Sequence, residues 1–163
     1  MSVDTGLTVA TPTATEIVLT RKFAAGRELL FETLTRPDLL RRWYGARGWT
    51  LVECQIDLRE GGTWRFVSRG PDGEEMGQRG EYRQIDPPAR LVFTEVFDNQ
   101  SYPGETLIAH QLSETEEVTT LRTVVRYASQ AARDKVLRYP MARGLSEAYT
   151  RLDQVLRART RTS

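Results

Sequence analysis

Two side chains with acid–base capacity, Glu95 and His110, stand in runs of alternating apolar and polar residues. Glu95 shares its parity with Leu91 and Phe93, and His110 shares its parity with Ile108, so the alternation directs both toward an apolar interior. An inward carboxyl with a raised pKa can serve as a general base or a polar anchor, and a neutral imidazole can exchange a proton near neutral pH. The alternative makes Glu95 a solvated or arginine-paired residue at the sheet end and His110 a hydrogen-bonded structural residue.

Aromatic and long apolar side chains form a second group of candidates. Aromatic rings combine a large apolar area with specific contact geometry, so they suit the wall of a ligand pocket as well as a filled core. Core packing is the competing interpretation, because large aromatics ordinarily supply buried area. With the two acid–base residues included, the candidate ligand-binding residues are Trp43, Trp64, Phe66, Tyr82, Phe93, Glu95, His110, Met141 and Leu145.

Several kinds of chemistry are excluded or disfavoured by composition. Cys54 is the only cysteine and His110 the only histidine, which excludes an intrachain disulfide and a Cys/His zinc cluster from this chain alone. Cys54 falls in a buried pattern, typical of an inert core thiol. The Gly61-Gly62 and Gly70-Pro-Asp-Gly73 sequences lack the lysine and Ser/Thr of a phosphate-binding loop. We therefore expect no cofactor and no metal, and assign no catalytic residue.

The charge balance gives no overall attraction to nucleic acid or anionic lipid, since the net charge is +1 and the pI about 7.9. Arginines cluster near the C-terminus, but Glu147 and Asp153 interrupt them, which favours a solvated helix face. We expect neither a nucleic-acid nor a membrane partner, and a cytoplasmic location fits the single cysteine. The predicted organisation is a flexible leader (1–15), one domain (16–159) and a tail (160–163).

The elements that must position these candidates follow from changes in periodicity. Alternation predicts a strand near 17–23, after which helical spacing and Pro37 predict two short helices up to Trp43. A six-strand meander follows, joined by Gly- and Pro-containing turns, with strands near 50–58, 63–68, 76–85, 90–97, 105–112 and 118–127. A short helix near 131–137 precedes a long one. Short connections favour antiparallel neighbours.

The last helix carries a continuous apolar face, formed by Met141, Leu145, Ala148, Leu152 and Val155. A long amphipathic helix and a half-buried sheet satisfy each other's need for burial when one packs on the other. The sequence therefore predicts an α+β fold with a curved antiparallel sheet of about seven strands, two short helices and a long C-terminal helix.

An ordered set of short motifs resembles a known family. The motifs are Ile17-Val-Leu-Thr-Arg-Lys-Phe23, Thr35-Arg-Pro37, Arg42-Trp-Tyr-Gly45, Asp57-Leu-Arg-Glu-Gly-Gly62, Gly80-Glu-Tyr82 and Pro87-Pro-Ala-Arg-Leu-Val-Phe-Thr-Glu95. Their order and spacing over residues 16–157 resemble the Hsp90-ATPase-activator-like (AHSA1-like) branch of the START/Bet v 1 (SRPBCC) superfamily. The resemblance implies a helix-grip fold, whose sheet wraps around the C-terminal helix and can leave an apolar cavity. Two positions depart from the family pattern: Gly26 replaces a common proline and Glu117 a common turn glycine.

Three functions are compatible with these features. The leading hypothesis is a small-molecule-binding domain that holds an apolar or amphipathic ligand between sheet and helix. The first alternative is a cyclase- or hydrolase-type enzyme that uses Glu95 or His110 as its acid or base. The second, implied by the family resemblance, is co-regulation of an Hsp90-type chaperone ATPase, with a stress response as its setting. A homodimer is compatible with all three.

Overall fold

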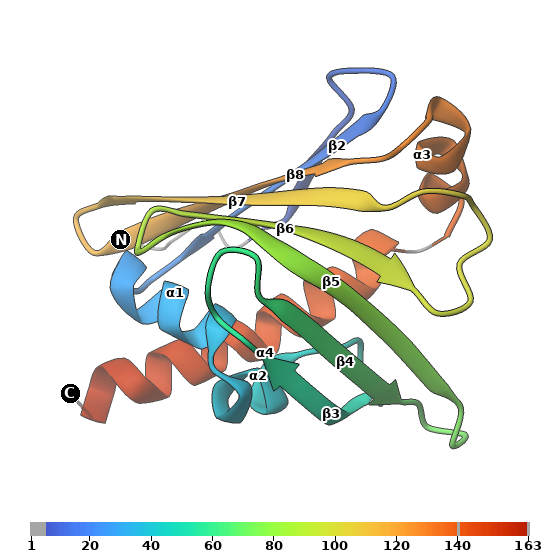
Figure 1. The fold of residues 1–163 in the computed structure, drawn as a ribbon. Helices are drawn as coiled ribbons and strands as arrows, with labels where there is room; N and C mark the ends of the chain where they lie inside the picture. The colour runs from blue at the N-terminus through green and yellow to red at the C-terminus, as the bar shows by residue number, and fades with distance from the viewer. Residues whose placement is uncertain (1–5, 140, 163) are drawn as a thin grey trace.

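A long C-terminal helix crosses one face of a curved antiparallel sheet, and two short helices lie on the same side (Figure 1). The computed structural model describes residues 6–139 and 141–162. The strands are β1 (Thr8–Ala10), β2 (Glu16–Phe23), β3 (Thr50–Ile56), β4 (Thr63–Arg69), β5 (Glu75–Asp86), β6 (Arg90–Phe97), β7 (Thr106–Thr115) and β8 (Val118–Arg126). The helices are α1 (Arg27–Thr35), α2 (Pro37–Trp43), α3 (Gln130–Leu137) and α4 (Met141–Thr162). This confirms the predicted α+β fold class.

The sheet has eight strands in the order β1-β2-β8-β7-β6-β5-β4-β3, all antiparallel, where about seven were expected. The additional strand is β1, which pairs with β2 at one edge. It lies within residues 1–15, which we expected to form a flexible leader; residues 1–5 lie outside the described residues. The three residues of β1 are too few to show an alternation of apolar and polar side chains. Its pairing with β2 therefore could not be predicted from the sequence.

The two positions that depart from the family pattern lie side by side. Gly26 precedes α1 and supplies no side-chain cap, so the carboxylate of Glu114 on β7 caps the helix by accepting a hydrogen bond from the Arg27 amide (2.8 Å). Glu116 and Glu117 form the β7–β8 turn with φ of 53° and 64°. These values lie in the left-handed region that glycine adopts more easily than glutamate.

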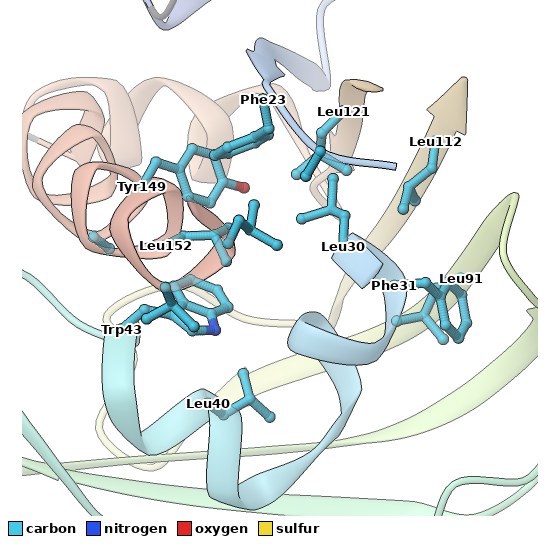
Figure 2. Close-up of a cluster of buried hydrophobic side chains, with 14 of the residues drawn as sticks. Phe23, Leu30, Phe31, Leu40, Trp43, Leu91, Leu112, Leu121, Tyr149 and Leu152 are labelled. Atoms are coloured by element: carbon cyan, nitrogen blue, oxygen red, sulfur yellow. The ribbon is translucent and has the colours of Figure 1, made fainter. Parts of the chain in front are cut away.

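The tightly packed part of the core lies under the C-terminal half of α4. Phe23, Leu30 and Leu152 are fully buried there, and Leu121 is 1% exposed. Figure 2 shows these side chains pointing toward one another, with Tyr149 of α4 beside Phe23 at a ring-centroid distance of 5.6 Å. Helices α1 and α2 close this end by packing against α4. Such dense packing of large apolar side chains is the main source of stability in a domain of this size.

The N-terminal half of α4 is less completely covered. Met141 and Leu145 are only half-buried, and they pack against a second apolar cluster built on β2, β7 and β8. That cluster consists of Ile17, Leu19, Ile108, Val125, Tyr127 and Ala132. None of the helices in the described part of the chain is long and apolar enough to cross a membrane.

Candidate functional site

Strand register places Glu95, Phe93 and His110 on the concave face of the sheet, the face that α4 covers. On β6 and β7, Glu95 pairs with the buried Thr106, and Leu91 of the core pairs with His110. Glu95 and His110 are therefore four residues apart along the strand direction, or about 13 Å. Phe93 lies between them, with its ring centroid 5.4 Å from that of His110. The two acid–base candidates thus share one face but do not contact each other.

The Glu95 carboxyl group accepts a hydrogen bond from a side-chain amide. The Gln78 side chain, on β5, is 2% exposed and donates a hydrogen bond from Nε2 to Glu95 Oε2 at 2.8 Å. Burial raises the pKa of Glu95 from 4.5 to about 7, and the hydrogen bond from Gln78 opposes this rise. Among the described residues, no arginine or lysine forms an ion pair with it. In the described part of the chain, Glu95 is therefore not paired with an arginine, and the residue keeps a partial exposure.

Three tyrosines from separate parts of the chain surround this carboxyl. Tyr44 follows α2, Tyr102 lies in the β6–β7 loop and Tyr127 follows β8. Burial raises the pKa of each tyrosine, and the negative charge of Glu95 adds to this rise in all three. We call these residues, with Gln78 and Glu95, the Glu95 cluster. At neutral pH its phenols are uncharged donors around one titrating carboxyl.

His110 is a neutral imidazole at the other end of this face. Its Nδ1 lies 2.8 Å from the Thr123 hydroxyl on β8. Burial lowers its pKa from 6.5 to about 4, so the ring carries no charge at neutral pH. Tyr149 of α4 interacts with the same hydroxyl, and burial raises the pKa of Tyr149 to about 12. The hydrogen bond agrees with the structural interpretation of His110, although only one ring nitrogen is used.

Both side chains keep one polar atom free of hydrogen bonds. Within the described residues, Glu95 Oε1 and His110 Nε2 have no partner. Neither atom is among the described side-chain atoms that lack a partner and are fully shielded from solvent. Glu95 and His110 are also only half-buried, although burial dominates the pKa of each. Each free atom therefore borders space that a water-sized group can enter.

The wall beside Glu95 is aromatic. Trp64 and Phe66 of β4 are buried, with ring centroids 4.8 Å apart, and Phe93 lies 5.7 Å from Trp64. The Trp64 indole crosses Gly80 and donates from Nε1 to the Thr94 carbonyl at 3.2 Å. A Cβ on Gly80 would lie 1.8 Å from that carbonyl oxygen, so only glycine permits this approach. Trp64 is thereby fixed in orientation by the backbone that carries Glu95.

The remaining candidates divide between the packed core and the half-buried region. Trp43 is 4% exposed and donates from Nε1 to the Thr33 carbonyl at 3.0 Å, within the packed core. Tyr82 is equally buried and contacts Phe93 with ring centroids 6.2 Å apart. Leu145 is half-buried and contacts both apolar clusters. Trp43 therefore belongs to the packed core and Tyr82 packs against Phe93, whereas Phe93 and Leu145 retain some exposed surface.

Four members of the Glu95 cluster were missing from the sequence-based candidates. Gln78 shares strand parity with Tyr82, so its inward direction could have been inferred from alternation. Tyr127 similarly continues the parity of Val125. Tyr44 and Tyr102 lie outside helices and strands, where periodicity carries no information about direction. Their contribution depends on tertiary structure alone.

The metal-ligating, thiol and surface features of the described residues do not add to this site. The described residues contain no group of three or more His, Cys, Asp and Glu placed to hold a metal ion. Burial raises the pKa of the Cys54 thiol to about 11, so it stays protonated and unreactive. A surface depression of about 910 Å³ lies between the β7–β8 turn and the start of α1, but it is open, and its lining includes the exposed acidic residues Glu28, Glu114, Glu116 and Glu117.

Comparison with known proteins identifies relatives across most of the chain. The family model described as Activator of Hsp90 ATPase homolog 1-like protein matches residues 24–157. A solved structure from Rhodobacter sphaeroides is 39% identical, with a TM-score of 0.88 over 93% of this chain and 98% of that chain. One from Mycobacterium smegmatis is 25% identical, with a TM-score of 0.83 over 93% and 97%.

A more distant likeness concerns the fold alone. The AHSA1 protein from Silicibacter pomeroyi is 21% identical, with a TM-score of 0.72 over 88% of this chain and 99% of that chain. No curated protein matches the sequence. Since the family model spans most of the chain and the helix-grip fold agrees with it, the chain belongs to the Activator of Hsp90 ATPase homolog 1-like family, within the SRPBCC superfamily.

Proposed function

We propose that this protein binds an apolar or amphipathic small molecule in a hollow between the concave face of the sheet and the N-terminal half of α4. The observation that carries the proposal is the pair of deep, half-buried side chains, Glu95 and His110, each with a free polar atom that borders accessible space. A filled core offers no reason for either atom to remain both unpartnered and accessible.

The contrast between the two ends of the interior supports this location. Under the C-terminal half of α4, Leu30 and Leu152 have no exposed surface. Under its N-terminal half, Phe93, Met141 and Leu145 all retain some, although they belong to the same sheet face and helix face. The proposed hollow is lined by Trp64, Phe66, Phe93, Glu95, His110, Met141 and Leu145. Tyr82 packs against Phe93 from the same sheet face, and Trp43 lies outside the hollow in the packed core.

The lining suggests how a ligand would be held. Removal of apolar ligand surface from water against rings and aliphatic side chains supplies affinity, at roughly 25 cal/mol per Å². A few convergent polar atoms then fix orientation. His110 Nε2 and Glu95 Oε1 suit this role because neither is committed to another residue that the structure describes. Their separation of about 13 Å along the strands matches an elongated molecule better than a compact one.

A binding experiment with a simple amphiphile tests the proposal. We expect 1-decanol to shift the NMR signals of Phe93 and His110 and to raise the melting temperature. At a ligand concentration of 100 times Kd the free energy gain is about 2.7 kcal/mol, which corresponds to roughly 5–10 °C. The Leu145→Trp variant should lose these responses because indole occupies the hollow. Leu58→Trp is the matched control, since Leu58 is exposed outside the site.

Two results would contradict the binding proposal. One is the absence of any NMR or melting response to decanol and related amphiphiles. The other is an equal response in the folded Leu145→Trp variant, which would place binding elsewhere. Preservation of the far-ultraviolet circular dichroism spectrum establishes that this variant is folded.

The acid–base enzyme remains a second candidate because one observation favours it. Glu95 has a pKa of about 7, a value suited to a general acid or base at neutral pH. The distance to His110 means that the two residues would act separately rather than as a relay. Turnover of a bound compound that is abolished in Glu95→Gln would establish catalysis, whereas unchanged ligand after prolonged incubation would leave binding alone.

The family description supplies the third candidate, co-regulation of a chaperone ATPase. The family and its fold are compatible with either a ligand-binding or a co-chaperone-type domain. The ATPase rate of an Hsp90-type chaperone, measured with and without this protein, separates the two. An unchanged rate together with no complex in size-exclusion chromatography would reject the co-chaperone role.

A further inference from the structure

We infer that the ligand of this hollow carries a protonated amine, which binds between the Glu95 carboxylate and the aromatic side chains beside it. The inference rests on the proposed function, because it assigns a chemical class to the ligand of that same site. It follows from three observations: a carboxyl without a cationic partner, an aromatic wall, and the absence of other inward charge among the described residues nearby.

The first observation is that Glu95 lacks a cationic partner. A buried carboxylate is stable when it is paired and its remaining oxygen is hydrogen-bonded. Gln78 supplies one neutral donor to Oε2, and Oε1 receives none from the described residues. An ammonium group at Oε1 would supply both the missing charge and the missing donor.

The second observation is the aromatic character of the surrounding face. Phe93 and Phe97 lie two residues before and after Glu95 on the same side of β6. Across β5, Gly80 carries no side chain, so the Trp64 ring of β4 reaches this position. Aromatic ring faces attract cations and are indifferent or unfavourable to anions. The wall that provides apolar area therefore also favours a positive headgroup.

The third observation concerns the charge of every element packed around Glu95. The facing groups from β5, the α2–β3 connection, the β6–β7 loop and the end of β8 are the uncharged Gln78, Tyr44, Tyr102 and Tyr127. From β7 they are Thr106 and the distant neutral His110, and α4 presents Met141 and Leu145. Helix α3 presents Val136, while its Lys135 donates a hydrogen bond to the Ser101 carbonyl of the β6–β7 loop at 2.9 Å. An anionic headgroup would be repelled by the Glu95 carboxylate and would compete with it for the donors that Gln78 and the neighbouring phenols supply.

The inference predicts a specific dependence of affinity on pH. An alkyl ammonium group stays protonated throughout the neutral range, as lysine does, so only Glu95 changes charge. Burial holds the pKa of Glu95 at about 7, so amine affinity should rise about tenfold per pH unit between pH 5 and 7 and level off above. A neutral alcohol of equal length should show no such rise.

The test compares three ligands of equal chain length, 1-aminodecane, 1-decanol and decanoate, by calorimetric titration at pH 5.5 and 8. Concentrations stay below the micellar concentrations of the two ionic compounds and below the solubility limit of 1-decanol. We expect 1-aminodecane to bind at least tenfold more tightly than 1-decanol at pH 8, with a smaller preference at pH 5.5. Glu95→Gln should abolish the amine preference and retain decanol binding. Glu81→Gln is the matched control: it makes the same change on an exposed residue of the neighbouring strand and should leave both affinities unaltered.

The outcomes separate this inference from the proposal on which it rests. Decanol binding with no preference for the amine, or tighter binding of decanoate, would overturn the amine inference and leave the hollow in place. An amine preference that is the same at both pH values, or that survives in Glu95→Gln, would overturn the assignment to Glu95. No binding of any of the three compounds would overturn the proposed function itself.

Discussion

Replacement of Glu95 by glutamine should make the protein more stable at pH 8, in contrast to most substitutions of a buried residue. In the folded state the pKa of Glu95 lies near 7, against 4.5 ordinarily. Between these values the folded protein holds a proton that the unfolded chain has released, so stability falls as pH rises. At 1.36 kcal/mol per pH unit the full loss is about 3 kcal/mol, present above pH 7 and absent below 4.5. Glutamine removes this loss and can still accept the Gln78 hydrogen bond.

His110 contributes a dependence of opposite sign over nearly the same range. Its pKa falls from 6.5 to about 4 on folding, so between these values the unfolded chain holds the extra proton. Stability therefore rises with pH there, by about 3 kcal/mol in total, and is lost as pH falls toward 4. Between pH 4.5 and 6.5 the contributions of Glu95 and His110 offset each other in the wild-type protein. Each single variant should expose the dependence that the other residue contributes.

Urea unfolding followed by tryptophan fluorescence at pH 5, 6.5 and 8 measures these effects. The difference in unfolding free energy between Glu95→Gln and wild type should grow from near zero at pH 5 to about 2–3 kcal/mol at pH 8. The difference isolates one group, because all other titrating groups are common to both proteins. A Glu95→Gln variant that is less stable than wild type at pH 8, or a difference independent of pH, would refute the assignment of a raised pKa to Glu95.

Four further substitutions probe packing and backbone geometry by urea unfolding. Gly80→Ala should destabilise by about 3 kcal/mol, because its Cβ would lie 1.8 Å from the Thr94 carbonyl oxygen; a loss below 1 kcal/mol would contradict this. Glu117→Gly should stabilise by about 0.5–1 kcal/mol, since φ is 64° there; reduced stability would disprove strain at this turn. Leu152→Ala should cost about 3–4 kcal/mol and Leu145→Ala under 2, because only Leu152 is fully buried; equal costs would argue against looser packing around Leu145.

The sequence was sufficient to predict the fold because its periodic signals are long. Alternation through the strands and the apolar face of α4 predicted the layers, and Pro37 marked the start of α2. Glu117, which stands where the family commonly has a turn glycine, also indicated the β7–β8 turn, in which Glu116 and Glu117 have positive φ values. Strand β1 was not predicted, because it is stabilised by pairing with β2, and this pairing depends on tertiary structure rather than on a local sequence pattern.

The candidate site was less accessible to sequence reasoning than the fold. Parity alone indicated the inward direction of Glu95 and His110, but no local pattern distinguishes a packed aromatic from one that faces free space. Trp43 and Phe93 illustrate this limit. The helical spacing of Trp43 and the strand parity of Phe93 both predict an inward ring, yet Trp43 is buried in the core and Phe93 is half-buried. The difference arises because α1 and α2 cover the end of the interior that holds Trp43, whereas α3 and the N-terminal half of α4 leave Phe93 partly exposed at the other end.

The stability loss at Glu95 bears on why a carboxyl occupies this position. A cost of about 3 kcal/mol is a substantial share of the 5–15 kcal/mol by which domains are ordinarily stable. A glutamine could keep the hydrogen bond with Gln78 without that cost, and an apolar side chain could fill the space. A purely structural role therefore gives no account of the carboxyl, because each structural requirement is met better by another residue. A ligand that supplies the missing positive charge accounts for it, since the same group that destabilises the empty protein then stabilises the complex.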